Sequence, residues 1–216
     1  MESIDVMPMR VRIASRLRKA ILAGEFKEGQ SLSLTETSKQ LGISRTPVRE
    51  AFQTLEAEGF IELRMNKHAL VRGITVKFIQ DHYKTRIILE GEAAYCAAEN
   101  NMDITPLVER NLLIKNKSPG FTADEFAEYN QWFHVSIWDA ADNQRLRSLL
   151  MGFWNGASVG RAIPGEDHFI RSIKEHEQIT AAIKNHRAAD AKRLMGNHIF
   201  RGMQNILKSY QDVQAD

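Results

Sequence analysis

The sequence predicts a mainly α-helical protein with two domains: a small N-terminal domain of three helices and a β-hairpin, and an all-helical antiparallel bundle. Apolar residues recur at helical spacing along most of the chain. Alternation of apolar and polar residues, which is typical of strands, is confined to a short stretch before Gly73. The character of the sequence changes at that glycine. We therefore expect domains of residues 1–73 and 74–216.

The N-terminal domain is predicted from three helical segments and one hairpin. The first helix lies in VRIASRLRKAILAG and ends at Gly24, and the second lies in TETSKQLG and ends at Gly42. The third lies in SRTPVREAFQTLEAEG, where Ser44 is the N-cap and Gly59 marks the end. Residues 60–72 then indicate a two-stranded hairpin with a polar tip.

The second domain is predicted to contain only helices. They are separated by breaks at KNKSPGF, AADN and AIPGEDH. We expect them at Thr75 to about Asn100, Thr105 to about Lys115, Thr122 to about Ala141, Asn143 to about Val159, Glu166 to about Asn185, and Ala188 to about Tyr210. Helices of this kind bury their apolar faces by packing into a bundle.

The composition is that of a folded protein without internal cross-links. Of the 216 residues, 43% are hydrophobic and 26% are charged, which is enough for a core. Cys96 is the single cysteine, which excludes an intramolecular disulfide and a cysteine-based zinc site. No apolar run reaches the roughly 18–20 residues of a membrane helix, and the N-terminus lacks the apolar segment of a secretory signal. We therefore expect a cytoplasmic protein that does not enter a membrane.

The N-terminal domain also carries the excess of positive charge. The first 73 residues contain 12 Lys and Arg against 9 Asp and Glu, whereas the remainder contains 17 against 18. Two helices joined by a tight turn in TSKQLGISRTPVRE have the proportions of a helix-turn-helix. Ser44, Arg45, Thr46 and Arg49 lie in the first turns of the second helix, where arginine can bond guanine and hydroxyls can reach phosphate. A helical domain with merely solvated charge is the alternative.

The hairpin after these helices would form a wing beside the DNA groove, with Lys67 and His68 at its tip. The stretch ISRTPVREAFQTLEAEGFIELRMNKHALV resembles the winged helix-turn-helix of the GntR family of bacterial transcription regulators, and the match extends over 13–73. The resemblance implies that the Ser44–Arg49 segment contacts an operator. The chain departs from the family at Leu34 and Thr35, where a glutamate and a basic residue are usual, and at His68, where a glycine is usual.

The histidines of the second domain form a separate pattern. Two of them, His168 and His186, lie at helix ends and are expected to be solvated. Three others fall in line with the apolar residues of three different helices: His134, His176 and His198. One inward histidine is usually structural, but three that face one interior each need a partner for the second ring nitrogen. A shared divalent cation satisfies all three, and Asn130, one turn before His134, could add an oxygen ligand.

The second domain has its own resemblance. The blocks KTRIILEGEAAYCAA, FHVSIWDAADNQRL and EHEQITAAIKNHRAADAKRLMGNHI are similar to the effector-binding helical domain of the FadR-type branch of the same family, the FCD domain. That resemblance implies a site for zinc, nickel or a similar divalent ion at Asn130, His134, His176 and His198. Asn130 stands where aspartate is usual and lowers the negative charge of the site. Arg86 matches an arginine that faces the effector cavity.

We predict a ligand-responsive transcription regulator, with repression as the favoured mode, that binds a near-palindromic double-stranded operator as a homodimer. A small-molecule effector, an organic or sugar acid, would dock at the open positions of the metal. A metal-free regulator of an acyl-type ligand and a metal-dependent hydrolase are the alternatives. The hydrolase is disfavoured because no glutamate is placed as a general base: Glu175 points about 100° away from His176 on a helix.

Overall fold

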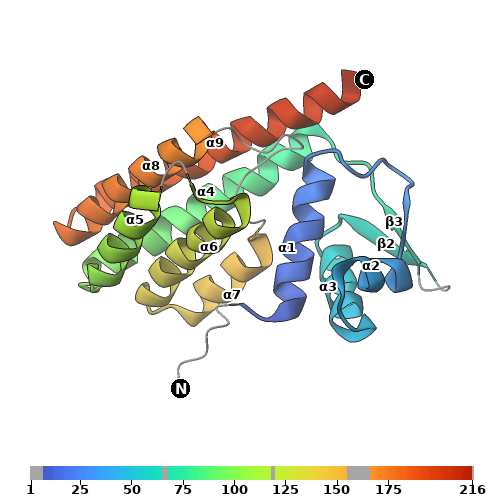
Figure 1. Cartoon of the computed structure of the whole chain (residues 1–216), viewed down its shortest axis with the longest axis horizontal. Coiled ribbons are helices and arrows are strands. Elements are labelled where there is room, and N and C mark those ends of the chain that lie inside the picture. Colours follow the sequence, from blue (N-terminus) through green and yellow to red (C-terminus); the bar gives the residue numbers. More distant parts are fainter. Residues whose placement is uncertain (1–6, 65–67, 118–119, 155–165, 216) are drawn as a thin grey trace.

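The computed structural model of the chain describes residues 7–64, 68–117, 120–154 and 166–215. Its N-terminal part contains three helices and three strands: α1 (Met9–Leu22), β1 (Ser31–Ser33), α2 (Leu34–Leu41), α3 (Arg45–Ala57), β2 (Ile61–Arg64) and β3 (His68–Val71). In Figure 1, α1 stands between α3 and the helical part of the molecule, and it contacts both α3 and α7 (Gln144–Phe153). The helix-turn-helix is therefore attached to the rest of the protein along α1.

The three strands form one antiparallel sheet in the order β1-β3-β2. Leu32 of β1 and Leu63 of β2 both pair with Ala69 of β3. The hairpin of β2 and β3 was predicted from the sequence, whereas β1 was not. A strand of three residues is too short to show a two-residue period, so only its pairing with β3 identifies it.

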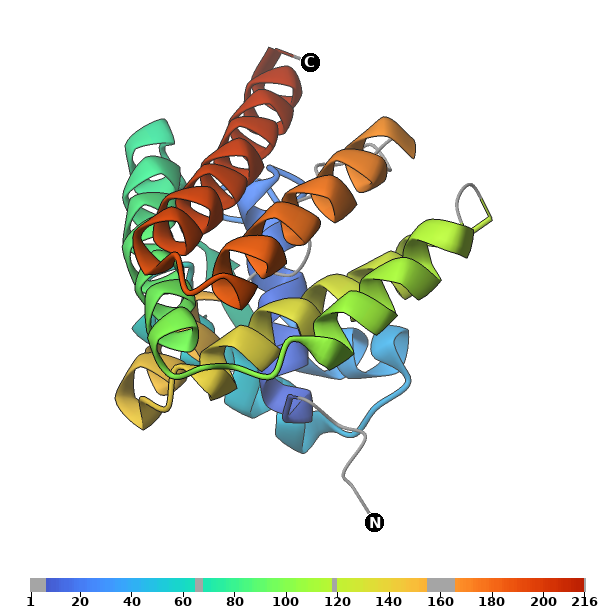
Figure 2. The same cartoon turned by 90° about the vertical axis from the view of Figure 1, so that its left-hand side faces the viewer.

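The rest of the described chain is helical, which confirms the mainly α fold class. The helices are α4 (Val76–Glu99), α5 (Thr105–Lys117), α6 (Ala123–Ala140), α7, α8 (Glu166–Lys184) and α9 (Ala188–Ala215). Figures 1 and 2 show them gathered into a bundle, in which α4 and α9 make the most extensive contact.

Two helix ends differ from the prediction. Helix α7 stops at Phe153 because Trp154 takes an extended conformation, and the expected continuation to Val159 lies outside the described residues. Helix α9 continues past the expected end at Tyr210 to Ala215, since its last residues include neither glycine nor proline.

The start of α6 is fixed by a capping box. The hydroxyl of Thr122 accepts a hydrogen bond from the backbone N–H of Glu125 at 3.2 Å, and the Glu125 carboxylate accepts one from the N–H of Thr122 at 2.8 Å. Asn130 and His134 are four residues apart on this helix and therefore lie on the same buried face.

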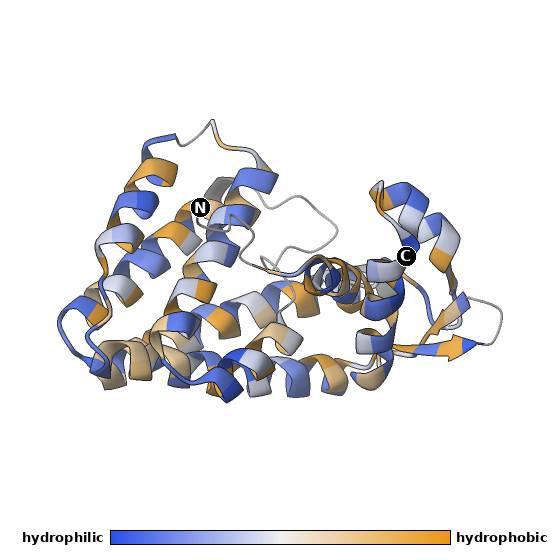
Figure 3. Cartoon of the chain, turned by 90° about the horizontal axis from the view of Figure 1, so that it is seen from below, coloured by the Kyte–Doolittle hydropathy of each residue, from blue (hydrophilic) through white to orange (hydrophobic). Residues whose placement is uncertain are grey.

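One hydrophobic cluster runs through both parts of the protein and includes Phe52 of α3, Trp138 of α6 and Trp154. Figure 3 shows hydrophobic and hydrophilic residues interspersed along the helices, as expected where each helix has one face in the core. Within the described ranges, no helix combines the length and the apolar character that crossing a membrane requires.

Candidate functional site

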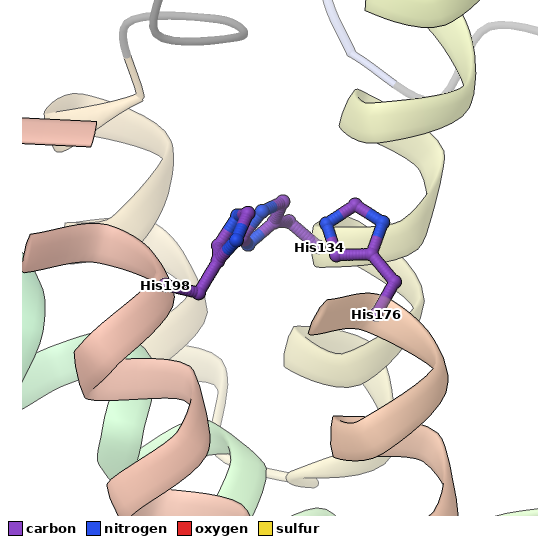
Figure 4. Close-up of side chains that lie close together, drawn as sticks. All are labelled: His134, His176 and His198. Carbon is purple, nitrogen blue, oxygen red and sulfur yellow. The ribbon is translucent and has the colours of Figure 1, made fainter. Parts of the chain in front are cut away.

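The three inward histidines meet in the bundle. His134 comes from α6, His176 from α8 and His198 from α9, and Figure 4 shows their rings pointing toward one another. One ring nitrogen from each lies within 4.8 Å of the other two. The exposed fractions of the three side chains are only 1%, 0% and 8%. Three different helices thus supply one buried cluster of nitrogen donors.

Each histidine has an oxygen partner at its Nδ1 atom. The distances are 2.8 Å from His134 to a Glu90 carboxylate oxygen, 2.7 Å from His198 to a Glu175 carboxylate oxygen, and 3.0 Å from His176 to the Tyr129 hydroxyl. An ionised carboxylate can only accept, so Nδ1 of His134 and of His198 carries the proton. In the neutral form of either ring the lone pair is therefore on Nε2, which is the arrangement of metal-binding histidines.

The ring of His176 has a buried nitrogen, Nε2, without a hydrogen-bond partner among the described residues. Burial lowers the pKa of His176 well below its usual range and that of His198 to about 4, so both rings are neutral near pH 7. A neutral ring with a buried, unpaired nitrogen beside two other imidazoles fits a divalent cation.

Glu90 on α4 is the residue that the sequence reading missed. Its carboxylate is fully buried and accepts hydrogen bonds from Arg86 Nη2 at 2.7 Å, from Trp138 Nε1 at 2.9 Å and from His134. Burial alone would raise the pKa of Glu90, but His134 and Arg86 outweigh it and hold the pKa far below the usual value. Its position four residues after Arg86, on the apolar stripe of the helix, was the available signal.

Arg86, the predicted effector residue, lines the same cavity as His134 and His198, with only 2% of its side chain exposed. Its guanidinium is paired with Glu90 and lies 5.2 Å from the centre of the Trp154 ring. Arg86 therefore contributes positive charge to the wall of the cavity while it is held in place by Glu90.

His168 does not behave as predicted. The sequence placed it in solvent at a helix end, but it is half-buried and lines the cavity. Its Nδ1 accepts from Arg201 at 3.2 Å, and burial together with Arg201 lowers its pKa to about 4. The first turn of α8 packs against α9, which the sequence alone could not indicate. The other predicted solvent histidine, His186, is exposed.

Arg201 of α9 is a second residue that sequence reasoning missed. It donates to the Glu175 carboxylate at 2.6 Å and to the Ser172 hydroxyl at 2.7 Å. Burial would raise the pKa of Glu175, but His198 and Arg201 lower it to about 2. Glu90 is thus paired with Arg86, and Glu175 is paired with Arg201 and, at 3.6 Å, with the exposed Arg171.

A small cavity opens beside the cluster. Its walls include Arg86, Asn130, His134, His168, His198 and Arg201. The space open to the centre of a water molecule is about 20 Å³, which accommodates about one water or ion. The predicted ligand Asn130 is therefore on the cavity with two of the histidines, and an organic molecule can enter only if the walls move.

The predicted DNA-contacting residues lie on an exposed face of α3. Ser44 is at the N-cap position without a side-chain capping bond, and Arg45, Thr46 and Arg49 are exposed. Neither arginine forms an ion pair with another described residue. The opposite face is buried through Val48, Ala51, Phe52 and Leu55. The helix thus presents uncommitted donors to solvent on a rigid support.

Of the two residues predicted at the tip of the wing, the structure describes only His68. His68 begins β3, is exposed and bonds the Ser31 hydroxyl at 3.2 Å, whereas Lys67 lies outside the described residues. The turn between α2 and α3 contains Gly42 with φ of 66°, a left-handed conformation that glycine adopts without strain.

Two protein-family models match the chain. The model for bacterial regulatory proteins of the gntR family matches residues 9–71, and the FCD domain model matches residues 81–201. The gluconate operon transcriptional repressor of Bacillus subtilis (strain 168) is 32% identical over 187 residues, covering 82% of this chain and 72% of that protein. The HTH-type transcriptional regulator YdhC of the same organism is 27% identical over 204 residues, which cover 92% of this chain and 91% of that protein.

Solved structures share the fold. E. coli McbR/YncC has a TM-score of 0.71 at 21% identity and covers 95% of this chain and 99% of its own. A GntR family transcriptional regulator from Pseudomonas syringae pv. tomato has a TM-score of 0.51 at 24% identity, covering 96% of this chain and 88% of its own.

The family matches and these relatives define a DNA-binding transcription regulator rather than an enzyme. The chain belongs to the GntR family, and its helical part is an FCD domain.

Proposed function

We propose that this regulator binds a near-palindromic operator as a homodimer and releases or engages it in response to a small organic or sugar acid held in the helical domain. The single observation that carries the effector site is the buried cluster of His134, His176 and His198, with an oxygen partner behind each ring. Such a cluster has no role in DNA contact, because it lies inside the bundle rather than on α3.

The DNA-binding half of the proposal rests on α3. Arg45 and Arg49 lie one turn apart on its exposed face, and Ser44 and Thr46 are beside them at the helix N-terminus. Arginine recognises guanine through two parallel hydrogen bonds, while a helix N-terminus favours a phosphate. Two copies of α3 in a homodimer would read two half-sites. Repression is the expected mode, in line with the names of the gluconate and D-xylose operon repressors among the relatives.

The helical half rests on the fit of the donors to a divalent ion. His134, His176 and His198 would hold it through Nε2, with Asn130 as the candidate oxygen ligand. Glu90 and Glu175 keep the first and last of these rings in the required tautomer. An ion bound there would supply a positive docking point for an anionic group.

Charge favours an acid as the effector. The carboxylates of Glu90 and Glu175 are already matched by Arg86 and Arg201, and Asn130 contributes no charge. The charge of a divalent ion would therefore remain unbalanced within this set of ligands, and a carboxylate would balance it. The name of the gluconate operon repressor is consistent with a sugar acid. The metal-free acyl-ligand alternative has less support, because most of the residues that line the cavity are charged or polar.

The test joins metal analysis to DNA binding. Metal content of the purified protein would be measured first, and a recognised DNA sequence would be selected from a random duplex library. DNA affinity would then be measured by fluorescence anisotropy with a panel of organic and sugar acids, with and without chelator. We expect bound metal and at least one acid that changes DNA affinity only in the metal-loaded protein. A metal-free protein that responds to the same acid would overturn the metal-centred proposal.

A further inference from the structure

One side chain joins the DNA-binding part to the helical domain. Arg18 of α1 is 1% exposed, and its guanidinium donates to Glu58 through Nε at 2.7 Å and Nη2 at 2.6 Å. Its remaining end, Nη1, donates to the backbone carbonyl of Trp154. A single planar group therefore holds residues that are 40 and 136 positions away along the chain.

Both acceptors lie at helix ends, which explains why they are available. Glu58 is the C-cap of α3, where a carboxylate is unfavourable beside the negative end of the helix dipole, so Arg18 offsets that cost. Trp154 is the C-cap of α7, and the last carbonyls of a helix have no partner within it. Arg18 satisfies both ends at once, one of them at the end of the exposed helix that carries Arg45 and Arg49.

The ring of Trp154 is packed against the candidate effector site. It is 1% exposed, and its centre lies 5.2 Å from that of the His134 ring and 5.5 Å from that of the Trp138 ring. The Arg86 guanidinium lies 5.2 Å from the same ring. One residue thus touches a predicted ligand through its side chain and holds the DNA-binding part through its backbone.

We infer that Arg18 and Trp154 couple the effector site to the recognition helix, a proposal that rests on the proposed function above. Zn²⁺ bound by the cluster would draw the three rings together, because two nitrogens on one zinc are at most about 4.2 Å apart, whereas those of His134, His176 and His198 are spread over up to 4.8 Å. A shift of His134 or Arg86 displaces the close-packed Trp154 ring, since a packed interior has no free space to absorb it. The Trp154 carbonyl then moves relative to Arg18, and the two-bond clamp on Glu58 carries that movement to α3.

The test measures Zn²⁺ affinity and the effect of Zn²⁺ on DNA affinity in the parent protein and three variants. Arg18→Lys keeps the positive charge but loses the planar fork. Trp154→Phe keeps the backbone carbonyl but loses ring contact with His134 and Arg86. Arg193→Lys is the matched control, since Arg193 forms an exposed pair with Asp190 on α9. Each protein would be prepared with Zn²⁺ or with chelator. Zn²⁺ affinity would be measured by calorimetry and DNA affinity by fluorescence anisotropy in both states, and thermal melting would verify folding.

In the parent and in Arg193→Lys we expect Zn²⁺ to change DNA affinity about tenfold, a usual size for allosteric coupling. In Arg18→Lys and Trp154→Phe the ratio of DNA affinity with Zn²⁺ to DNA affinity with chelator should approach one, while Zn²⁺ binding persists. An unchanged ratio in both folded variants overturns the inference and leaves the metal site standing. A parent that binds Zn²⁺ without a change in DNA affinity also overturns it. A parent that binds no Zn²⁺ in calorimetry removes the metal-centred function, and the inference with it.

Discussion

The carboxylate of Glu90 lies 2.8 Å from Nδ1 of His134, inside the bundle and away from all solvent. This contact fixes which nitrogen of His134 faces the other two histidines. It also ties the histidine to Arg86, because the same carboxylate accepts from the guanidinium at 2.7 Å. The arrangement gives Glu90 a positioning role that can be measured separately from metal ligation.

Glu90→Gln is expected to lower metal affinity by about 10–100-fold, the usual effect of losing an outer partner of a metal-binding histidine. It should also lower the free energy of unfolding by about 3–5 kcal/mol, because Arg86 is left as a buried charge without its counterion. Calorimetric titration with Zn²⁺ and thermal melting measure the two effects. Glu92→Gln is the control, since Glu92 lies two residues further along α4 in an exposed pair with Lys192. Equal Zn²⁺ affinity in both variants would contradict the role assigned to Glu90.

Asn130→Asp should bind metal more tightly than the parent, because it adds a negative charge to an otherwise neutral set of ligands. The same charge should weaken the response to an acidic effector, since less positive charge is left to attract it. Competition with a chromophoric chelator measures metal affinity, and anisotropy with acid measures the response. Asn130→Ala should bind metal more weakly than either. An Asn130→Asp protein with parent-like metal affinity would exclude residue 130 from the ligand set.

His134→Ala should reduce bound metal and abolish the effector response while leaving DNA binding without effector intact. The reason is spatial: His134 lies in the bundle, whereas the exposed donors Arg45 and Arg49 lie on α3. Metal analysis and anisotropy measure these properties, with His186→Ala as an exposed control. Full metal content in folded His134→Ala would show that this histidine is not a ligand.

Arg45→Ala or Arg49→Ala should cost about 1–3 kcal/mol of binding to the recognised DNA and relax sequence preference at the contacted position. Both side chains are exposed and form no ion pair with another described residue, so their loss should not affect folding. Gel-shift titrations against selected and mutated duplexes would test this, with Arg193→Ala as the control. If either variant binds both duplexes like the parent, that arginine does not read sequence.

The metal-free protein should lose stability as the pH falls from about 6.5 toward 4. Burial lowers the pKa of His168 to about 4, and burial with Arg18 and Arg86 lowers that of His82 well below its usual range. Below the unfolded pKa the unfolded chain therefore binds protons that the native state does not, which favours unfolding at up to about 1.4 kcal/mol per pH unit for each such group.

His82→Phe tests this pH dependence. His82 is packed against the rings of Phe60 and Phe153 at 5.8 and 5.2 Å, so an aromatic ring without a titrating group can occupy its place. Urea unfolding at pH 7 and pH 5 should show a smaller loss of stability in His82→Phe than in the parent. An equal loss in both would mean that His82 does not contribute to the acid sensitivity.

Much of the protein could be predicted from local patterns. The spacing of apolar residues located the helices, and the same stripes turned His134, His176 and His198 inward, because a helix places residues three and four apart on one face. Local signals for a helix start and for its exposed face were also sufficient to locate Ser44, Arg45, Thr46 and Arg49. These features depend on neighbours within a few residues, which a sequence displays directly.

The partners behind those residues could not be predicted in the same way. Glu90 and His134 are 44 residues apart, and Arg18 and Trp154 are 136 apart. Nothing in the stripe of α4 indicates that its glutamate meets a histidine of α6, and nothing in α1 indicates that an arginine surrounded by basic residues is buried. The same holds for β1, which is a strand only because β3 lies beside it, and for His168.

The sequence by itself determined the approximate helices, the family, the exposed arginines near the start of α3 and the inward direction of three histidines. The tertiary structure decided that these histidines converge, which atoms hold each ring, and that one arginine joins the two parts of the molecule. The physical reason is the range of the interactions. Periodicity and capping act between residues on one turn of the chain, whereas the pairing of buried charges depends on how separate helices pack, and burial makes each such pairing obligatory.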